Sequence, residues 1–240
     1  MYGCQAKIGL LVPSVNTVVE PEFNAFMPEG YVVLSSRMRN SESTAEDSRA
    51  MLAHAERAAD ELGSARVDVV VLACTAASFV DGPDGECELR RLIGEAANAT
   101  PVTTSAAVLG ALNQLGAERI TMVTPYPREL NELEVGFLGA SGVTVVSEVG
   151  LGVEDPYEIA LVEPDEVVDL ALKTLSPEAD ALFLSCTNLR TFEIIEELED
   201  RTGLPVISSN SATLCAALRV AGYEAAVSGL GRLLRTAVPV

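Results

Sequence analysis

The sequence predicts an α/β fold built from two similar parallel-sheet domains. Apolar runs of strand length, such as residues 69–72 and 181–184, are continuous rather than alternating, which is typical of parallel strands buried on both faces. These runs alternate along the chain with helical patterns. The two halves also repeat in register, because Cys186 lies 112 positions after Cys74 and Pro125 lies 112 positions after Pro13.

The first half is expected to hold four strands. They are predicted at residues 8–12, 31–34, 69–72 and 101–104. Helices are predicted to begin near Val18, at Ser43 or Thr44, at Glu86 and at Ser105. Pro13 ends the first strand, and Gly63 is expected to end one long helix that reaches about Leu62.

The second half repeats the same order of elements. Strands are predicted at 119–124, 143–146, 181–184 and within 203–209, and helices at 164–175, at 191–200 and up to about Val220. No Gly/Ser linker separates the halves. We therefore expect a tight boundary near Gly116 and a cleft between two like domains.

The chain is strongly acidic. Its 240 residues include 35 acidic and 16 basic side chains, for a formal net charge of −19. This charge argues against nucleic acid and anionic membranes as partners. An ordinary acidic enzyme and a protein adapted to a high-salt cytoplasm, with charges screened over about 3 Å at 1 M salt, both remain open. We expect a cytoplasmic protein, because neither a signal-peptide pattern nor an apolar run of about 18 residues occurs.

The cysteines match neither a disulfide framework nor a zinc site. Their number, five, is odd, and no two of them have CxxC spacing. The single histidine, His54, lies on an expected amphipathic helix, where a solvated position is favoured. Since G-x-G-x-x-G and P-loop motifs are also absent, we expect no metal and no cofactor.

Two cysteines are the candidate catalytic residues. Cys74 and Cys186 each follow a buried strand, and open α/β sheets place ligands at the carboxyl ends of their strands. Helices that begin there direct free N–H groups toward the site, which favours an anion and is expected to lower both thiol pKa values from about 8.5 toward neutrality. The same loops supply the candidate substrate-binding side chains, which are Ser14, Asn16, Thr75, Ser105, Tyr126, Thr187 and Ser209.

Several of these side chains have a second interpretation. Ser14, Ser105 and Ser209 can equally be helix caps. Arg37 and Arg190 can pair with a substrate carboxylate, although surface salt bridges are the favoured interpretation for both.

Four motifs carry a resemblance to a known family. They are Gly9–Thr17 (GLLVPSVNT), Ser35–Arg39 (SSRMR), Val123–Tyr126 (VTPY) and Ser185–Thr191 (SCTNLRT). Over nearly its whole length the chain resembles the maleate cis-trans isomerase and arylmalonate decarboxylase-like branch of the aspartate/glutamate racemase superfamily.

This resemblance implies an architecture. It implies two flavodoxin-like domains related by pseudo-twofold symmetry, with the active site in the cleft between them. The domains would comprise residues 1–115 plus 211–240, with the C-terminal helix returning to the first domain, and residues 116–210. A homodimer or a larger homo-oligomer is implied as well.

The resemblance also implies residue roles. By position, Cys74 corresponds to the isomerase's nucleophile, Cys186 to its second cysteine, and Asn16 and Tyr126 to residues that hold the substrate. A further asparagine of the isomerase has no counterpart here at residues 154–157. Arylmalonate decarboxylases have glycine at the first cysteine position, so two thiols argue against a simple decarboxylase.

The leading hypothesis is a cofactor-independent isomerase of a small dicarboxylate, with maleate to fumarate as the model reaction. Cys74 would form a covalent adduct and Cys186 would act as acid and base. The alternatives are a two-thiol amino-acid or hydroxy-acid racemase and an arylmalonate decarboxylase-like enzyme. A ligand-binding protein on the same scaffold is an unlike alternative, because fold does not fix function.

Overall fold

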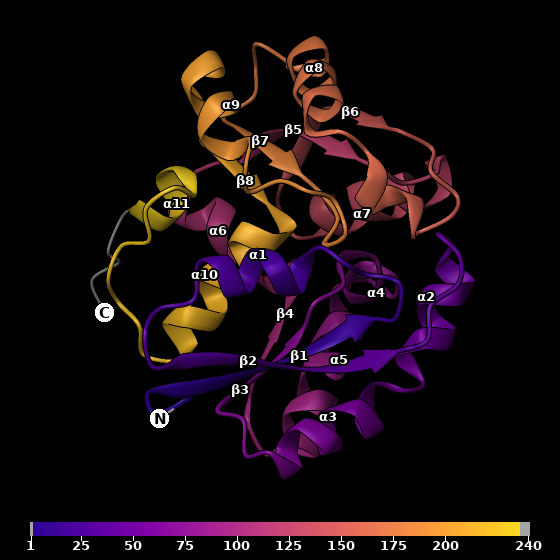
Figure 1. Cartoon of the computed structure of the whole chain (residues 1–240). Coiled ribbons are helices and arrows are strands. Elements are labelled where there is room, and N and C mark those ends of the chain that lie inside the picture. The colour runs from indigo at the N-terminus through magenta and orange to yellow at the C-terminus, as the bar shows by residue number, and fades with distance from the viewer. Residues whose placement is uncertain (1, 236–240) are drawn as a thin grey trace.

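The computed structural model describes residues 2–235 and consists of two four-stranded parallel sheets. The sheets have the orders β2-β1-β3-β4 and β6-β5-β7-β8, which repeat the same topology and confirm the predicted fold class. The strands are β1 (Ala6–Pro13), β2 (Tyr31–Met38), β3 (Val69–Leu72), β4 (Thr100–Thr103), β5 (Arg119–Thr124), β6 (Thr144–Gly150), β7 (Ala181–Leu184) and β8 (Val206–Ser208). Figure 1 shows the first sheet in the lower half of the molecule and the second in the upper half.

Eleven α-helices and one 3₁₀ helix (Glu158–Leu161) surround the sheets in the described residues. The helices are α1 (Val19–Ala25), α2 (Ala45–Leu52), α3 (Ala55–Ser64), α4 (Thr75–Phe79), α5 (Gly82–Ala97), α6 (Thr104–Leu115), α7 (Arg128–Ala140), α8 (Pro164–Thr174), α9 (Ile195–Thr202), α10 (Ser209–Val220) and α11 (Gly231–Arg235). None of the helices between residues 2 and 235 is long and apolar enough to cross a bilayer.

The central strands explain why the sequence forms this fold. Every residue of β3 and of β7 is buried, as expected for a parallel strand covered on both faces. Within each sheet this strand pairs with the first strand of its half, β1 or β5, and with the last, β4 or β8. Since all strands in a sheet run the same way, their carboxyl ends share one edge. Cys74 and Cys186 follow two of those ends.

Some predicted helix boundaries are wrong. The single helix expected from residue 44 to Leu62 is two helices, α2 and α3. The α-helical hydrogen bonding is interrupted at Ala53 and His54, where the His54 N–H donates to Met51 O, three residues back, instead of to the carbonyl four residues back. No Gly or Pro marks this break in the sequence. Helix α3 also continues through Gly63.

Capping and one whole helix also differ from expectation. Thr103 caps α6 and Ser208 caps α10, whereas Ser105 and Ser209 lie inside those helices. Pro83 lies in the first turn of α5, which therefore begins at Gly82 instead of residue 86. Helix α7 was not predicted, and its inner face carries polar residues that weaken the amphipathic pattern.

The C-terminal helices link the two halves. Helix α10 leaves the second sheet and packs against α6, with further contacts to α1, β3 and β4. Helix α11 packs on β8 and α9 and also contacts α6 and α10. Residues 211–220 therefore pack on elements of the first half. The domain division itself stays a prediction, and residues 1 and 236–240 of it lie outside the described part of the chain.

A buried carboxylate joins the halves beside the cleft. Glu22 on α1 accepts hydrogen bonds from the N–H groups of Thr191 (2.9 Å) and Phe192 (3.0 Å) and from Asn210 Nδ2 (2.6 Å). Burial nevertheless raises the pKa of Glu22 to about 7, and the hydrogen bonds offset this only in part. The Thr17 N–H donates to Asn188 Oδ1 (2.9 Å) across the same boundary. These contacts fix how the two strand edges face each other.

Candidate active site

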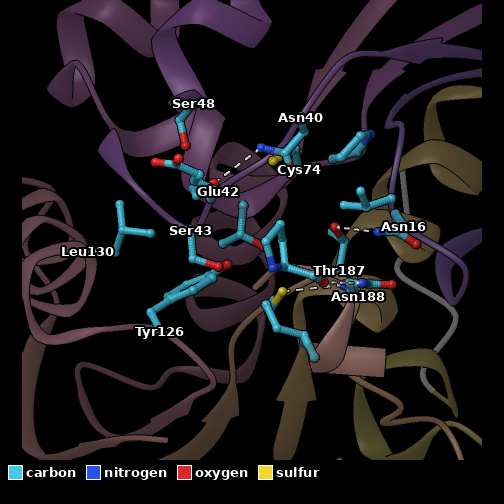
Figure 2. A pocket seen from close by; sticks show the side chains of 17 residues that line it. Asn16, Asn40, Glu42, Ser43, Ser48, Cys74, Tyr126, Leu130, Thr187 and Asn188 are labelled. Atoms are coloured by element: carbon cyan, nitrogen blue, oxygen red, sulfur yellow. Dashed lines mark hydrogen bonds between the residues drawn. The ribbon is translucent and has the colours of Figure 1, made fainter. Parts of the chain in front are cut away.

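A pocket lies where the carboxyl edges of the two sheets meet. Both halves contribute to it, and Figure 2 shows the side chains that line it. The lining residues are Pro13, Val15, Asn16, Asn40, Glu42, Ser43, Ser48, Cys74, Thr75, Ala76, Tyr126, Leu130, Pro156, Ile159, Cys186, Thr187 and Asn188. The pocket therefore brings together both predicted catalytic cysteines and four of the predicted substrate-binding residues.

Cys74 stands at the junction of β3 and α4. Its backbone is extended, with φ −151° and ψ 115°, and it immediately precedes the first residue of α4. The N–H groups of Ala76 and Ala77 hydrogen-bond its sulfur and favour the thiolate. Burial has the larger effect and raises the pKa of the Cys74 thiol to about 12.

Cys186 has a different backbone at the matching position. Its φ is 108°, in the left-handed region that side-chain-bearing residues rarely adopt. The Asn188 N–H donates to its sulfur at 3.4 Å, and its own N–H donates to Ser209 Oγ at 3.0 Å. Burial raises the pKa of this thiol to about 11, the Tyr126 hydroxyl lowers it, and the charge of Glu134 raises it.

The expectation of near-neutral thiol pKa values was wrong, because burial raises both values. Two N–H groups at each sulfur do not offset burial, and among the described residues no Lys, Arg or His side chain lines the pocket. Arg37 instead donates to the carbonyls of Ser14 (3.1 Å) and Asn16 (2.9 Å) and pairs with Glu20. Arg190 pairs with Glu163 at 2.8 Å.

Asn16 and Thr187 form a hydrogen-bonded chain in the pocket wall. Asn16 Oδ1 accepts from the N–H groups of Val18 (2.9 Å) and Val19 (3.0 Å) and so orders the turn that leads into α1. Its Nδ2 donates to Thr187 Oγ1 at 3.1 Å, and this hydroxyl in turn donates to Ala73 O at 3.1 Å. Both side chains are therefore held in fixed positions.

The remaining predicted residues divide into two groups. Thr75 and Tyr126 line the pocket, whereas the three serines do not. Ser14 Oγ bonds the backbone of Asn40, and Ser105 Oγ bonds Ser78 Oγ at 2.5 Å behind the Cys74 loop. Ser209 Oγ accepts from both the Cys186 N–H and Thr75 Oγ1 (2.9 Å), so this serine orients the cysteine loop from outside the pocket.

Sequence reasoning missed one wall of the pocket. Three polar residues of the segment between β2 and α2 line it, namely Asn40, Glu42 and Ser43, together with Ser48 on α2. The Ser35–Arg39 motif directly before this segment was the available signal. Pro156 and Ile159 line the side where residues 154–157 carry no asparagine.

A buried carboxyl group behind the pocket was also missed. Glu134 on α7 is 2% exposed, and Ser185 Oγ lies 2.7 and 2.9 Å from its two carboxyl oxygens. Burial raises the pKa of Glu134 to about 8. Once Glu134 is ionised, its charge raises the pKa values of both Tyr126 and Cys186. Because α7 itself was not predicted, this residue could not be placed from the sequence.

Within residues 2–235, no cluster of three or more His, Cys, Asp or Glu side chains is arranged to hold a metal ion.

Comparison with known proteins now identifies the family. The family model described as arylmalonate decarboxylase matches residues 8–234. The chain belongs to this family. It is 33% identical over 239 residues to the maleate isomerase of Nocardia farcinica, covering 95% of both chains. It is 31% identical over 242 residues to the maleate isomerase of Geobacillus stearothermophilus, covering 95% of this chain and 96% of that one.

A solved structure of the family is close to this fold. It is the Nocardia farcinica maleate cis-trans isomerase as a cysteine-to-serine mutant with a covalently bound succinylcysteine intermediate. The TM-score is 0.91 at 32% identity, and the match covers 96% of this chain and 98% of that chain.

The backbone of Cys186 predicts an unusual response to glycine. Glycine in a helix or strand normally makes a protein about 0.5–1 kcal/mol less stable than alanine does. A left-handed φ, however, costs conformational energy for every residue other than glycine. We expect Cys186→Gly to have a free energy of unfolding about 1 kcal/mol higher than Cys186→Ala, measured by urea denaturation. At Cys74, where the backbone is extended, the alanine variant is expected to be more stable than the glycine variant. Greater stability of the alanine variant at both positions would contradict the assigned strain.

The buried Glu134 predicts a pH-dependent stability. Folded Glu134 keeps its proton up to about pH 8, whereas an unfolded carboxyl releases it near 4.5. The unfolded state therefore binds fewer protons between these values, so the free energy of unfolding falls as the pH rises. Relative to wild type, Glu134→Gln is expected to be more stable at about pH 8.5 than at about pH 5.

Urea denaturation at the two pH values measures this difference, and a matched control is available on the same helix. Glu132 is exposed, so Glu132→Gln is expected to differ from wild type by the same amount at both pH values. Glu22 titrates in all three proteins and cancels from the comparison. A pH-independent difference between Glu134→Gln and wild type would show that Glu134 is ionised at neutral pH.

Proposed function

We propose that this chain is a cofactor-independent isomerase that converts maleate to fumarate. One observation supports this proposal above the others: Cys74 and Cys186, contributed by opposite halves, line one buried pocket. Relatives named maleate isomerase match the chain over nearly its whole length. The covalent succinylcysteine in the related mutant enzyme supports the same chemistry for a cysteine here.

Neutral donors would bind the substrate carboxylates. The Tyr126 and Thr75 hydroxyls line the pocket, and the N–H groups at the start of α4 and after Cys186 point at the sulfur atoms. In a pocket with little water, such donors stabilise negative charge more strongly than they would in solution. They also hold the enolate charge that develops when a nucleophile adds to the double bond. A small dicarboxylate can thus bind without a cationic side chain.

The reaction divides into addition, rotation and elimination. The Cys74 thiolate forms a C–S bond to one alkene carbon, and the electron pair of the double bond moves to the neighbouring carbon as an enolate. The Cys186 thiol transfers its proton to that carbon, which gives a succinyl thioether with a rotatable single bond. After rotation, the Cys186 thiolate removes a proton from the same carbon, the double bond re-forms, and Cys74 leaves as thiolate.

The two thiols are expected to have unequal roles because their surroundings differ. Cys186 follows β7 in a loop, and its sulfur is contacted by the Tyr126 hydroxyl and by backbone N–H groups. Cys74 receives two N–H groups at the start of a helix, an arrangement that stabilises a thiolate once it forms. The environment thus favours Cys74 as nucleophile and Cys186 as acid.

A racemase is the second candidate. In a two-base racemase one thiolate removes an α-proton and the other thiol returns a proton to the opposite face. Two thiols contributed from opposite halves also suit this reaction, which forms no covalent adduct.

The resemblance and the net charge also bear on the oligomeric state and the cellular compartment of the enzyme. We infer that the enzyme works in the cytoplasm as a homodimer or larger homo-oligomer. The net charge of −19 is compatible with a high-salt cytoplasm, because salt would screen the self-repulsion of so acidic a chain.

Proton NMR of maleate incubated with the protein tests the isomerase against the racemase. We expect wild type to produce fumarate, and we expect Cys74→Ala and Cys186→Ala to lose roughly 10³-fold or more in rate, because each removes a group that reacts. Cys87→Ala, at an exposed cysteine, is the matched control and is expected to retain full activity. Wild-type protein that makes no fumarate, yet exchanges the α-proton of an amino or hydroxy acid with D₂O, would support the racemase instead.

A further inference from the structure

Ser43 has an unusual position in the pocket wall. The residue is only 8% exposed, and its hydroxyl has no hydrogen-bond partner among the described residues. It lines the pocket, and Figure 2 shows it pointing into the cavity with Tyr126, which comes from the other half. A buried hydroxyl without a partner is costly, so such groups usually serve a ligand or a bound water.

The segment around Ser43 is firmly held, so the position of the hydroxyl is fixed in advance. The Ser43 N–H donates to Glu154 O at 3.0 Å and thereby joins the two halves across the pocket. Asp47 Oδ2 accepts from the N–H groups of Ser41 (2.9 Å) and Glu42 (3.2 Å) on the preceding turn. The hydroxyl is therefore presented to the pocket by a rigid backbone.

The Ser43 hydroxyl does not cap the helix that follows it. The capping of α2 is carried out by Thr44, whose Oγ1 accepts from the Asp47 N–H at 3.1 Å. Ser43 itself contributes only its backbone N–H to the surrounding contacts. The hydroxyl therefore makes no structural hydrogen bond within residues 2–235 and is available to a ligand.

We propose that the Ser43 hydroxyl donates a hydrogen bond to one carboxylate of the dicarboxylate substrate and so selects for a second acidic group. This inference deepens the proposed function by assigning a specificity residue to it. The neighbouring Glu42 is exposed, and Figure 2 shows its side chain on the Ser48 side of the pocket, away from Ser43. Its charge is therefore solvated and leaves the Ser43 end open to a carboxylate.

Calorimetric binding of succinate and butyrate tests the inference without turnover. These two acids have the same carbon count and differ in the second carboxylate. We expect Ser43→Ala and Ser43→Gly to bind succinate roughly tenfold more weakly than wild type, while the affinity for butyrate stays unchanged. The KM for maleate is expected to rise by a similar factor with kcat less affected. Ser41→Ala, at an exposed serine on the same segment, is the control and is expected to match wild type in every assay.

The outcomes separate this inference from the proposed function. Unchanged succinate affinity in both Ser43 variants would overturn it, and so would equal weakening of succinate and butyrate, which indicates a structural role. Wild type that binds no succinate would overturn it as well. Wild type that binds succinate through Ser43 yet makes no fumarate would leave the inference standing and refute the isomerase.

Discussion

The hydroxyl of Thr187 makes the contact on which the site depends. It donates to Ala73 O, one residue before Cys74, and belongs to the residue that directly follows Cys186. One side chain therefore links the backbones of both cysteine loops across the boundary between the halves. Asn16 Nδ2 donates to the same hydroxyl and ties in the start of α1. The distance between the two thiols is thus set by hydrogen bonds that a folded chain cannot easily rearrange.

Burial has opposite effects on the resting protein and on the reaction. It raises the pKa values of Cys74 to about 12 and of Cys186 to about 11, so burial alone disfavours the thiolate form of either cysteine. The same burial strengthens every N–H dipole directed at a developing charge. An enzyme of this kind loses some readily available thiolate and gains stabilisation of charge during the reaction. The left-handed backbone of Cys186 is a further cost accepted at the site.

The sequence was sufficient for those parts of the fold that local patterns encode. Fully apolar strands such as 69–72 and 181–184, and the equal spacing of the two cysteines, gave the topology and the position of the thiols. The sequence was not sufficient where tertiary packing determines whether a helix forms and where it ends. The break between α2 and α3 has no helix breaker, and α7 carries Asn131 and Glu134 on its buried face.

The thiol pKa values and the pocket wall that contains Ser43 could be determined only from the three-dimensional structure. Helix N-termini suggested lowered thiol pKa values, but only the structure shows that burial outweighs two N–H groups without a nearby cation. Ser43 looked in the sequence like a candidate cap for α2. Its neighbour Thr44 takes that role, and only the fold brings the Ser43 hydroxyl to the pocket.

The central claim is that the two thiols act differently, with Cys74 as the nucleophile. Intact-protein mass spectrometry and peptide mapping of Cys186→Ser after incubation with maleate test this most directly. In this variant the serine hydroxyl or water supplies the proton that completes the addition, but no thiolate removes it again, so the adduct is expected to accumulate as a mass increase of one maleic acid on the peptide that contains Cys74. Fumarate formation by wild type with no adduct on Cys74 under any quench, or an adduct found on Cys186 in Cys74→Ser, would contradict the account.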